Sequence, residues 1–206
     1  SSMYSFCTRL LEGVMHSSDH SPGPDLPRVL HVLAPGRFGG LERVVAMLAL
    51  EWAARRGQVG VALAVDPDHR VPDSWSALET NGVNVMRFRV PNRAYRREWR
   101  LYRDTIREWQ PDLVHCHGYR PDILAGWAVR ALGLTRVSTV HGFTGGGCKN
   151  RLYERLQIRA LARFDGVIAV SRPIQVRLAA AGVPDRCLTV IPNALRGEAL
   201  CSRSAA

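Results

Sequence analysis

The stretch that decides the fold spans residues 111–140 and reads PDLVHCHGYRPDILAGWAVRALGLTRVSTV. Residues 113–116 form a short apolar run that predicts a buried strand. Residues 122–132 have the spacing of an amphipathic helix, which Gly133 ends, and residues 136–140 predict a second strand. A strand, a helix and a further strand in this order are typical of the βαβ unit, in which the two strands run parallel.

The same alternation continues on both sides of this unit. Further strands are predicted at 29–33, 59–65, 83–90, 166–170 and 188–191, and further helices at 41–56, 74–81, 94–109, 150–163 and 173–181. The strands are nearly continuous apolar runs, which indicates a sheet covered on both faces. We therefore predict an α/β fold with a doubly wound, Rossmann-like parallel sheet of about seven strands. Ligands of such sheets bind beyond the carboxyl ends of the strands, so the residues after each strand are the candidates for function.

Length and composition fit one globular domain. The chain has 206 residues, of which 46% are hydrophobic and 22% charged, close to the globular average. No apolar run approaches the length of a transmembrane helix. We predict a flexible N-terminal arm at 1–27, one folded domain at 28–195 and a disordered tail at 196–206. The five cysteines are odd in number and form no CxxC pair, which favours reduced thiols in a cytoplasmic protein.

A basic helix carries much of the charge. Lys and Arg number 28 against 18 Asp and Glu, a net charge of +10. Helical spacing predicts that one stripe of residues 94–109 faces the core: Trp99, Tyr102, Ile106 and Trp109. The basic side chains flanking this stripe include Arg96, Arg97, Arg100 and Arg103. Such a helix favours an anionic ligand or membrane surface, with a plain solvated face as the alternative. No nucleic-acid-binding motif is present, so no nucleic-acid partner is expected.

The first glycine pair is a candidate phosphate contact. Residues 34–42 read APGRFGGLE and lead from the first strand straight into a helix. Gly39 and Gly40 let a ligand approach the backbone, and a helix N-terminus offers free N–H groups to phosphate. The sequence matches neither GxGxxG nor a Walker A loop, which disfavours NAD binding and P-loop ATP hydrolysis. A tight turn that needs glycine only for steric reasons is the alternative.

Three histidines lie within or directly after the predicted strands at 113–116 and 136–140. His115 and His117 alternate along one strand, which places both imidazoles on one face. A metal pair is one interpretation, but no spaced carboxylates complete it and Asp122 is the nearest, so no metal ligand is predicted. The simpler interpretation makes His115 a core histidine and puts His117 at the rim of the cleft. His141 follows the next strand beside a glycine-rich loop, where it could donate a hydrogen bond or exchange a proton near pH 7; a loop-capping role is the alternative.

Five ordered landmarks carry a resemblance to a known family. They are GGLE (39–42), PDLVHCH (111–117), TVHG (139–142), FDGVIAVS (164–171) and VIPN (190–193). Together, over about residues 28–195, they resemble the N-terminal, acceptor-side half of GT-B glycosyltransferases of the family-4 type.

This resemblance implies a function and a site. It implies a retaining hexosyltransferase that moves a hexose from a nucleotide-diphosphate sugar to a glycan or lipid-linked acceptor, with no cofactor and no required metal. By resemblance, Gly39 and Gly40 would meet the donor diphosphate and His141 would be the catalytic residue beside the transferred sugar. His117 would line the acceptor side. The arginines named above would face the acceptor or an anionic membrane.

The sequence also departs from the family. The donor-binding C-terminal domain is absent, Ala194 stands where the family has glycine, and no E-x7-E motif occurs. We expect the chain alone to be inactive, its donor-binding domain coming from missing sequence or a partner chain. We expect a cytoplasmic protein with peripheral contact at the inner membrane surface. Two alternatives stay open: a non-catalytic module that binds anions or membranes through its arginines, and a metal-dependent hydrolase built on His115, His117 and His141.

Overall fold

The computed structural model describes residues 26–35, 39–68, 75–91, 93–143 and 147–192. The tail expected at 196–206 and nearly all of the arm expected at 1–27 lie outside these residues. Within them the strands are β1 (Val29–Leu33), β2 (Val59–Val65), β3 (Asn84–Arg89), β4 (Leu113–His117), β5 (Thr135–Val140), β6 (Gly166–Ala169) and β7 (Leu188–Val190). The helices are α2 (Gly40–Ala54), α3 (Ser76–Glu79), α4 (Tyr95–Trp109), α5 (Tyr119–Ala131), α6 (Cys148–Leu161) and α7 (Arg172–Ala180), followed by the 3-10 turn η2 (Asp185–Cys187).

All seven described strands form one parallel sheet in the order β3-β2-β1-β4-β5-β6-β7. This confirms the predicted fold class. The chain first builds outward from β1 to β3 and then returns to place β4 on the other side of β1. The sheet therefore has its topological switch point between β1 and β4, where ligands of open α/β sheets bind.

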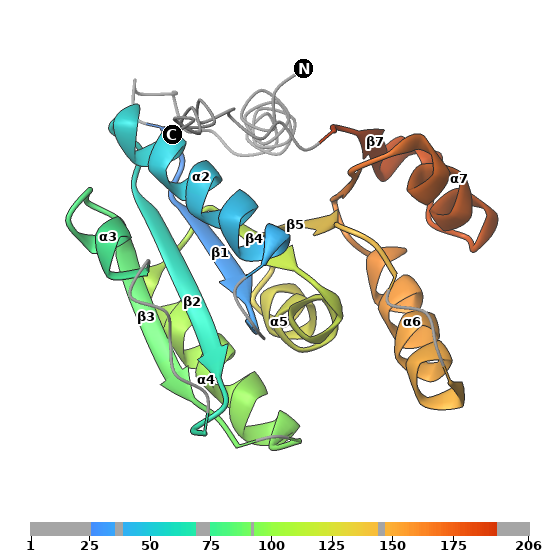
Figure 1. Ribbon diagram of the computed structural model, residues 1–206, viewed down its shortest axis with the longest axis horizontal. Coiled ribbons are helices and arrows are strands. Elements are labelled where there is room, and N and C mark those ends of the chain that lie inside the picture. The colour runs from blue at the N-terminus through green and yellow to red at the C-terminus, as the bar shows by residue number, and fades with distance from the viewer. Residues whose placement is uncertain (1–25, 36–38, 69–74, 92, 144–146, 193–206) are drawn as a thin grey trace, which may run out of the picture.

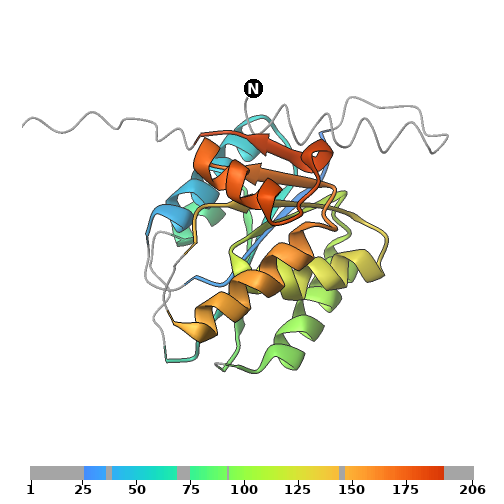
Figure 2. The same cartoon turned by 90° about the vertical axis from the view of Figure 1, so that its right-hand side faces the viewer.

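Helices cover the two faces of the sheet (Figures 1 and 2). On one face, Leu30 and Val114 pack with Tyr102 of α4, Ala128 of α5 and Leu161 of α6. On the other face, strand residues such as Leu33 and Leu63 pack with α2 and α3. The helix residues of this cluster include Val45, Trp52 and Leu78. Alternation along each strand separates these two sets, because neighbouring side chains point to opposite faces.

The helix α4 shows the predicted division between core and solvent. Tyr102 and Ile106 are buried, and Trp99 and Trp109 pack against the same cluster from partly buried positions. This orientation turns the basic flank of the helix to the outside. The stripe expected to face the core is thus confirmed.

The start of α5 differs from the prediction. The helix begins at Tyr119, three residues before the predicted start, and Gly118 precedes it with φ +88°. A left-handed φ favours glycine, and the Gly118 carbonyl accepts the first helical hydrogen bond from the Asp122 N–H at 3.1 Å. Pro121 lies in the first turn, where its missing N–H costs nothing. The helix therefore starts directly after His117.

Candidate functional site at the carboxyl ends of the strands

The site residues converge because β1, β4 and β5 are neighbours in the sheet and end at the same edge. His117 is the last residue of β4, and His141 directly follows β5. The His117 Nδ1 lies 3.4 Å from the His141 Nε2. The structure thus joins two histidines that sequence reasoning named separately.

His117 is buried, with 1% of its surface exposed. The expectation that it lies at the rim of the cleft is therefore wrong. Its register places it between Leu33 of β1 and Thr139 of β5, and α5 begins two residues later. Burial lowers the pKa of His117 well below its ordinary value, with the neighbouring histidines as a lesser cause. His117 is consequently neutral, and its Nδ1 contacts the partly exposed His141.

His141 is partly exposed, in contrast to His117. Burial of its ring lowers its pKa to about 4, so the imidazole is neutral at physiological pH. This leaves the hydrogen-bonding role expected from the sequence and argues against proton exchange near pH 7. A neutral imidazole offers one donor and one acceptor nitrogen, which suits a sugar hydroxyl.

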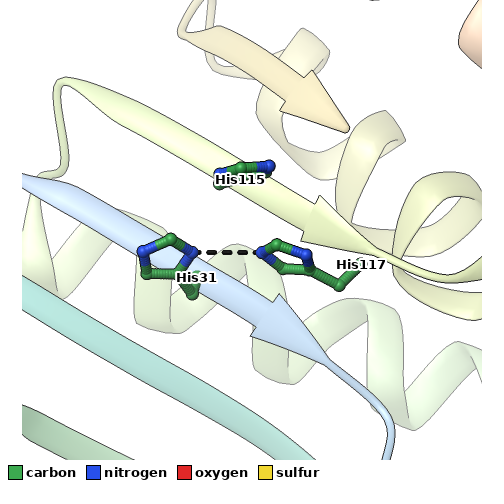
Figure 3. A group of neighbouring side chains, drawn as sticks. All are labelled: His31, His115 and His117. Carbon is green, nitrogen blue, oxygen red and sulfur yellow. Dashed lines mark hydrogen bonds between the residues drawn. The ribbon is translucent and has the colours of Figure 1, made fainter. Parts of the chain in front are cut away.

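His31 is a member of this cluster that sequence reasoning missed. It lies in the middle of β1, opposite His115 of β4, and its Nδ1 lies 3.1 Å from the His117 Nε2. Figure 3 shows His31 projecting from β1 toward the two histidines of β4. The sequence does mark His31 as unusual, because it is the one polar residue in the apolar run VLHVL at 29–33. The pairing partner, however, lies 84 residues away in sequence.

His115 fits the expected core position. It is 1% exposed, and its Nε2 is 2.8 Å from the Thr139 Oγ1. Its ring stacks on that of His117 with a centroid separation of 4.2 Å. Three imidazoles therefore occupy one buried patch of the sheet, beneath the partly exposed His141.

Gly39 and Gly40 lie at the start of α2, as predicted. The N–H of Gly39 donates to the Glu42 carboxylate at 2.8 Å, so that donor is already engaged within the chain. Gly40 is exposed, its φ is not positive, and a Cβ there would meet nothing within 4 Å. Neither crowding nor backbone strain requires glycine at residue 40, which weighs against the purely steric alternative.

Asp122 lies on the opposite side of the sheet from the histidines. Its Oδ1 accepts from Ser138, at 2.7 Å, and Ser138 pairs in register with Cys116, whose side chain belongs to the other core face. Its Oδ2 accepts from Gln157 at 2.7 Å. Burial raises the pKa of Asp122 to about 7, although the two hydrogen bonds act to lower it. Asp122 therefore links α5, β5 and α6 and does not complete a metal site with His115 and His117.

The basic flank of α4 is accessible. Arg96, Arg97 and Arg100 are exposed, and among the described residues none of them forms an ion pair. Arg103 differs, because it pairs with Asp104 at 2.7 Å and lies over the Trp99 ring at 5.1 Å. Three of the four predicted arginines thus present charges that the described part of the chain does not neutralise.

A tyrosine cluster at the starts of α4, α5 and α6 was also missed from the sequence. The Tyr95 and Tyr153 hydroxyls lie 3.1 Å apart, and the Tyr119 ring lies 5.3 Å from that of Tyr153. Beneath it, Arg120 forms an ion pair with Glu98, whose side chain is fully buried. Tyr119 stays 41% exposed. The three tyrosines are far apart in sequence, and only the parallel order of the strands brings these helix starts together.

The segment after His141 is fixed by α7. The Arg177 guanidinium lies 3.9 Å from the centre of the Phe143 ring and also pairs with Glu154 of α6 at 2.7 Å. A cation held over an aromatic face by a carboxylate restricts the ring. Phe143 is two residues beyond His141, so this contact anchors the far side of the histidine.

The chain is similar to known glycosyltransferases in sequence and in fold. The model of glycosyltransferase family 4 matches residues 38–196. The structure of HepE from Anabaena in complex with UDP and glucose has a TM-score of 0.66 and 18% identity, covering 82% of this chain and 45% of that one. A glycosyltransferase from Rickettsia africae has a TM-score of 0.62 and 15% identity, covering 81% of this chain and 42% of that one.

A third similar structure is the apo form of the lipopolysaccharide outer core galactosyltransferase WaaB. Its TM-score is 0.62 and its identity 14%, and the match covers 82% of this chain and 46% of that one. Identities at this level show a shared fold. The chain spans less than half the length of each of these three structures. No curated protein matches the sequence significantly.

Proposed function

Because the chain belongs to glycosyltransferase family 4, we propose that it forms the acceptor-side half of a retaining hexosyltransferase. The donor is a nucleotide-diphosphate sugar, and the acceptor is a glycan or a lipid-linked glycan. The observation that carries this proposal is the placement of Gly40, at the start of the helix after β1, and His141, directly after β5, at the carboxyl edge of the sheet. One has open space around its backbone, and the other is a neutral, partly exposed imidazole.

Each of these residues has a distinct role in the proposed reaction. The bond between the anomeric carbon and the diphosphate oxygen breaks, that carbon forms a bond to the oxygen of an acceptor hydroxyl, and the hydroxyl proton passes to the leaving diphosphate. Negative charge develops on the phosphate oxygens, which the N-terminus of α2 at Gly40 stabilises through its dipole and N–H groups. His141 hydrogen-bonds a hydroxyl of the transferred sugar and so orients the anomeric centre.

The neighbours of His141 support its role by holding the ring still. His117 contacts its Nε2 from within the sheet, and Arg177 restricts Phe143 beyond it. The His141 ring is therefore oriented before substrate arrives. Such preorganisation is what a transition-state contact requires.

The acceptor side is assigned to α4 and the tyrosine cluster. Arg96, Arg97 and Arg100 provide exposed positive charge, and Tyr119 provides an exposed aromatic face. Arginine binds phosphate in a bidentate manner, and aromatic rings pack on sugars or apolar chains. This combination suits a phosphate-linked lipid acceptor at an anionic membrane surface.

The remaining features concern the whole enzyme. We propose that a separate donor-binding domain, from further sequence or a partner chain, completes the active site, and that transfer needs no cofactor and no metal. We also propose a cytoplasmic site of action, with peripheral membrane contact through α4. None of the helices in the described ranges is long and apolar enough to cross a membrane.

The test compares the 206-residue chain with a longer form that carries a donor-binding domain. Both are supplied with UDP-, GDP- and ADP-hexoses, and sugar transfer and donor hydrolysis are measured. We expect consumption of one donor class by the longer form only. Donor consumption by neither form would instead favour the second candidate, an anion- or membrane-binding module, for which the unpaired arginines of α4 are the specific observation.

A further inference from the structure

Three histidines from two neighbouring strands share one buried patch (Figure 3). His31 of β1 pairs in register with His115 of β4, and His117 follows two residues later on the same face. One ring nitrogen from each histidine lies within 4.8 Å of the other two. We propose that His31, His115 and His117 bind a divalent transition-metal ion of the Zn²⁺ type. This site is additional to the proposed sugar transfer and does not depend on it.

The strand geometry suits a three-histidine site. Alternate residues of β4 direct two imidazoles to one face, and the in-register residue of β1 adds the third from the side. A tetrahedral Zn²⁺ at ~2.0–2.1 Å from each nitrogen needs ligand atoms roughly 3.3 Å apart. The His31 Nδ1 and the His117 Nε2 are already 3.1 Å apart. The ligand atom of His115 lies within 4.8 Å of these two and must move closer when the ion binds.

The charge state of the histidines is the one that a metal requires. Burial lowers the pKa of His31 to about 4 and the pKa values of His115 and His117 well below the ordinary value. All three rings are therefore neutral at pH 7 and keep one lone pair each, so protons do not compete with the ion. One of the two rings carries the proton of the hydrogen bond between His31 Nδ1 and His117 Nε2. When the ion binds, this proton moves to the other nitrogen of the same ring. No net proton is taken up or released.

Outer partners already orient two of the three rings. The Nε2 of His115 faces the Thr139 hydroxyl at 2.8 Å, and the Nδ1 of His117 faces the His141 Nε2 at 3.4 Å. Metal-binding histidines commonly engage their second nitrogen in this way, which fixes the tautomer. These partners leave the Nδ1 of His115 and the Nε2 of His117 as the ligand atoms.

The ligand set also selects the ion. Imidazole nitrogens without carboxylates suit Zn²⁺ and its first-row neighbours, whereas Mg²⁺ and Ca²⁺ require oxygen ligands. An ion here would clamp β1 to β4 at the topological switch point, directly behind His141. The sequence alone predicts no such site, because His31 lies far from His115 along the chain.

The experiment uses the chelator-treated 206-residue chain and titrates it with Co²⁺, which reports tetrahedral coordination by its visible absorption. We expect one bound equivalent, displaced by Zn²⁺, and a Zn²⁺-dependent rise in Tm. The single variants His31→Gln, His115→Gln and His117→Gln should lose the signal. The variant Thr139→Val, which removes the hydroxyl that faces the His115 Nε2, should bind about tenfold more weakly.

The matched control changes three of the four histidines that are not proposed ligands, His16, His20 and His69, to Gln in one variant. This variant should keep the signal. Circular dichroism without metal checks the folding of every variant. X-ray absorption of the Zn²⁺-loaded unsubstituted chain gives an independent count and should show three imidazole nitrogens. The proposal is overturned by absence of stoichiometric Co²⁺ binding, or by binding that survives His31→Gln and disappears in the control. None of these measurements involves a sugar donor, so they leave the proposed function untouched.

Discussion

The Nδ1 of His117 lies 3.4 Å from the Nε2 of His141, and this contact links a buried residue of the sheet to the candidate active site. Burial lowers the pKa of both rings, so neither carries a charge at neutral pH. The pair therefore acts by hydrogen bonding and orientation. A cationic histidine at residue 141 is disfavoured at physiological pH.

The variant Gly40→Ala tests the open space at the start of α2. A methyl group there meets no other atom within 4 Å in the described part of the chain, and alanine favours helix by up to about 1 kcal/mol over glycine, so we expect unchanged or slightly higher stability. In the longer, donor-containing form, the methyl group should displace the diphosphate and lower kcat/KM roughly 100-fold. Chemical unfolding and steady-state kinetics measure the two effects. Unchanged kinetics would show that no ligand approaches this backbone.

The pH dependence of stability should report Asp122. Its pKa is raised from 3.8 to about 7 in the fold, so the folded chain holds a proton that the unfolded chain releases above pH 4. Its contribution is present below pH 4 and is lost as the pH rises through 7. The loss amounts to up to about 4 kcal/mol, since one pKa unit is worth about 1.4 kcal/mol.

The variant Asp122→Asn isolates this contribution, because asparagine does not titrate and can still bond to Ser138 and Gln157. Urea unfolding at pH 4, 5.5 and 7 should give a free energy of unfolding that falls more steeply with pH in the unsubstituted chain than in the variant. Parallel curves would contradict the assignment.

The arginines of α4 should control binding to anionic vesicles. Replacing Arg96, Arg97, Arg100 and Arg103 by Gln should abolish sedimentation with vesicles rich in phosphatidylglycerol, and added salt should weaken binding of the unsubstituted chain. The control removes the same charge from exposed arginines on other surfaces: Arg56, Arg130, Arg155 and Arg159. If the control weakens vesicle binding equally, net charge rather than α4 is responsible.

The sequence predicted the sheet closely because each strand is a compact apolar run between turn residues. Predicted element boundaries agree with the structure within two residues, except at the start of α5. There, the predicted helix begins at residue 122, whereas the observed helix begins at Tyr119 and Pro121 occupies its first turn behind the left-handed Gly118. Local patterns thus determined the elements.

The site was less accessible to sequence reasoning because its geometry depends on pairing between distant strands. His31 and His117 are 86 residues apart and meet only through the register of β1 and β4. The burial of His117 and the position of Asp122 on the other face follow from the same register and from the early start of α5. The tyrosine cluster likewise required the positions of three helix starts.

The most direct test of the central claim is the sugar-transfer rate of the donor-containing form with His141→Gln, measured beside a His69→Gln control. Glutamine keeps hydrogen-bonding groups and a similar size but cannot reproduce the imidazole that contacts His117. We predict a fall in kcat of roughly 100-fold or more, as for loss of a transition-state hydrogen bond, with an unchanged Tm and full activity in the control. A His141→Gln enzyme that transfers sugar at the unsubstituted rate would contradict the account.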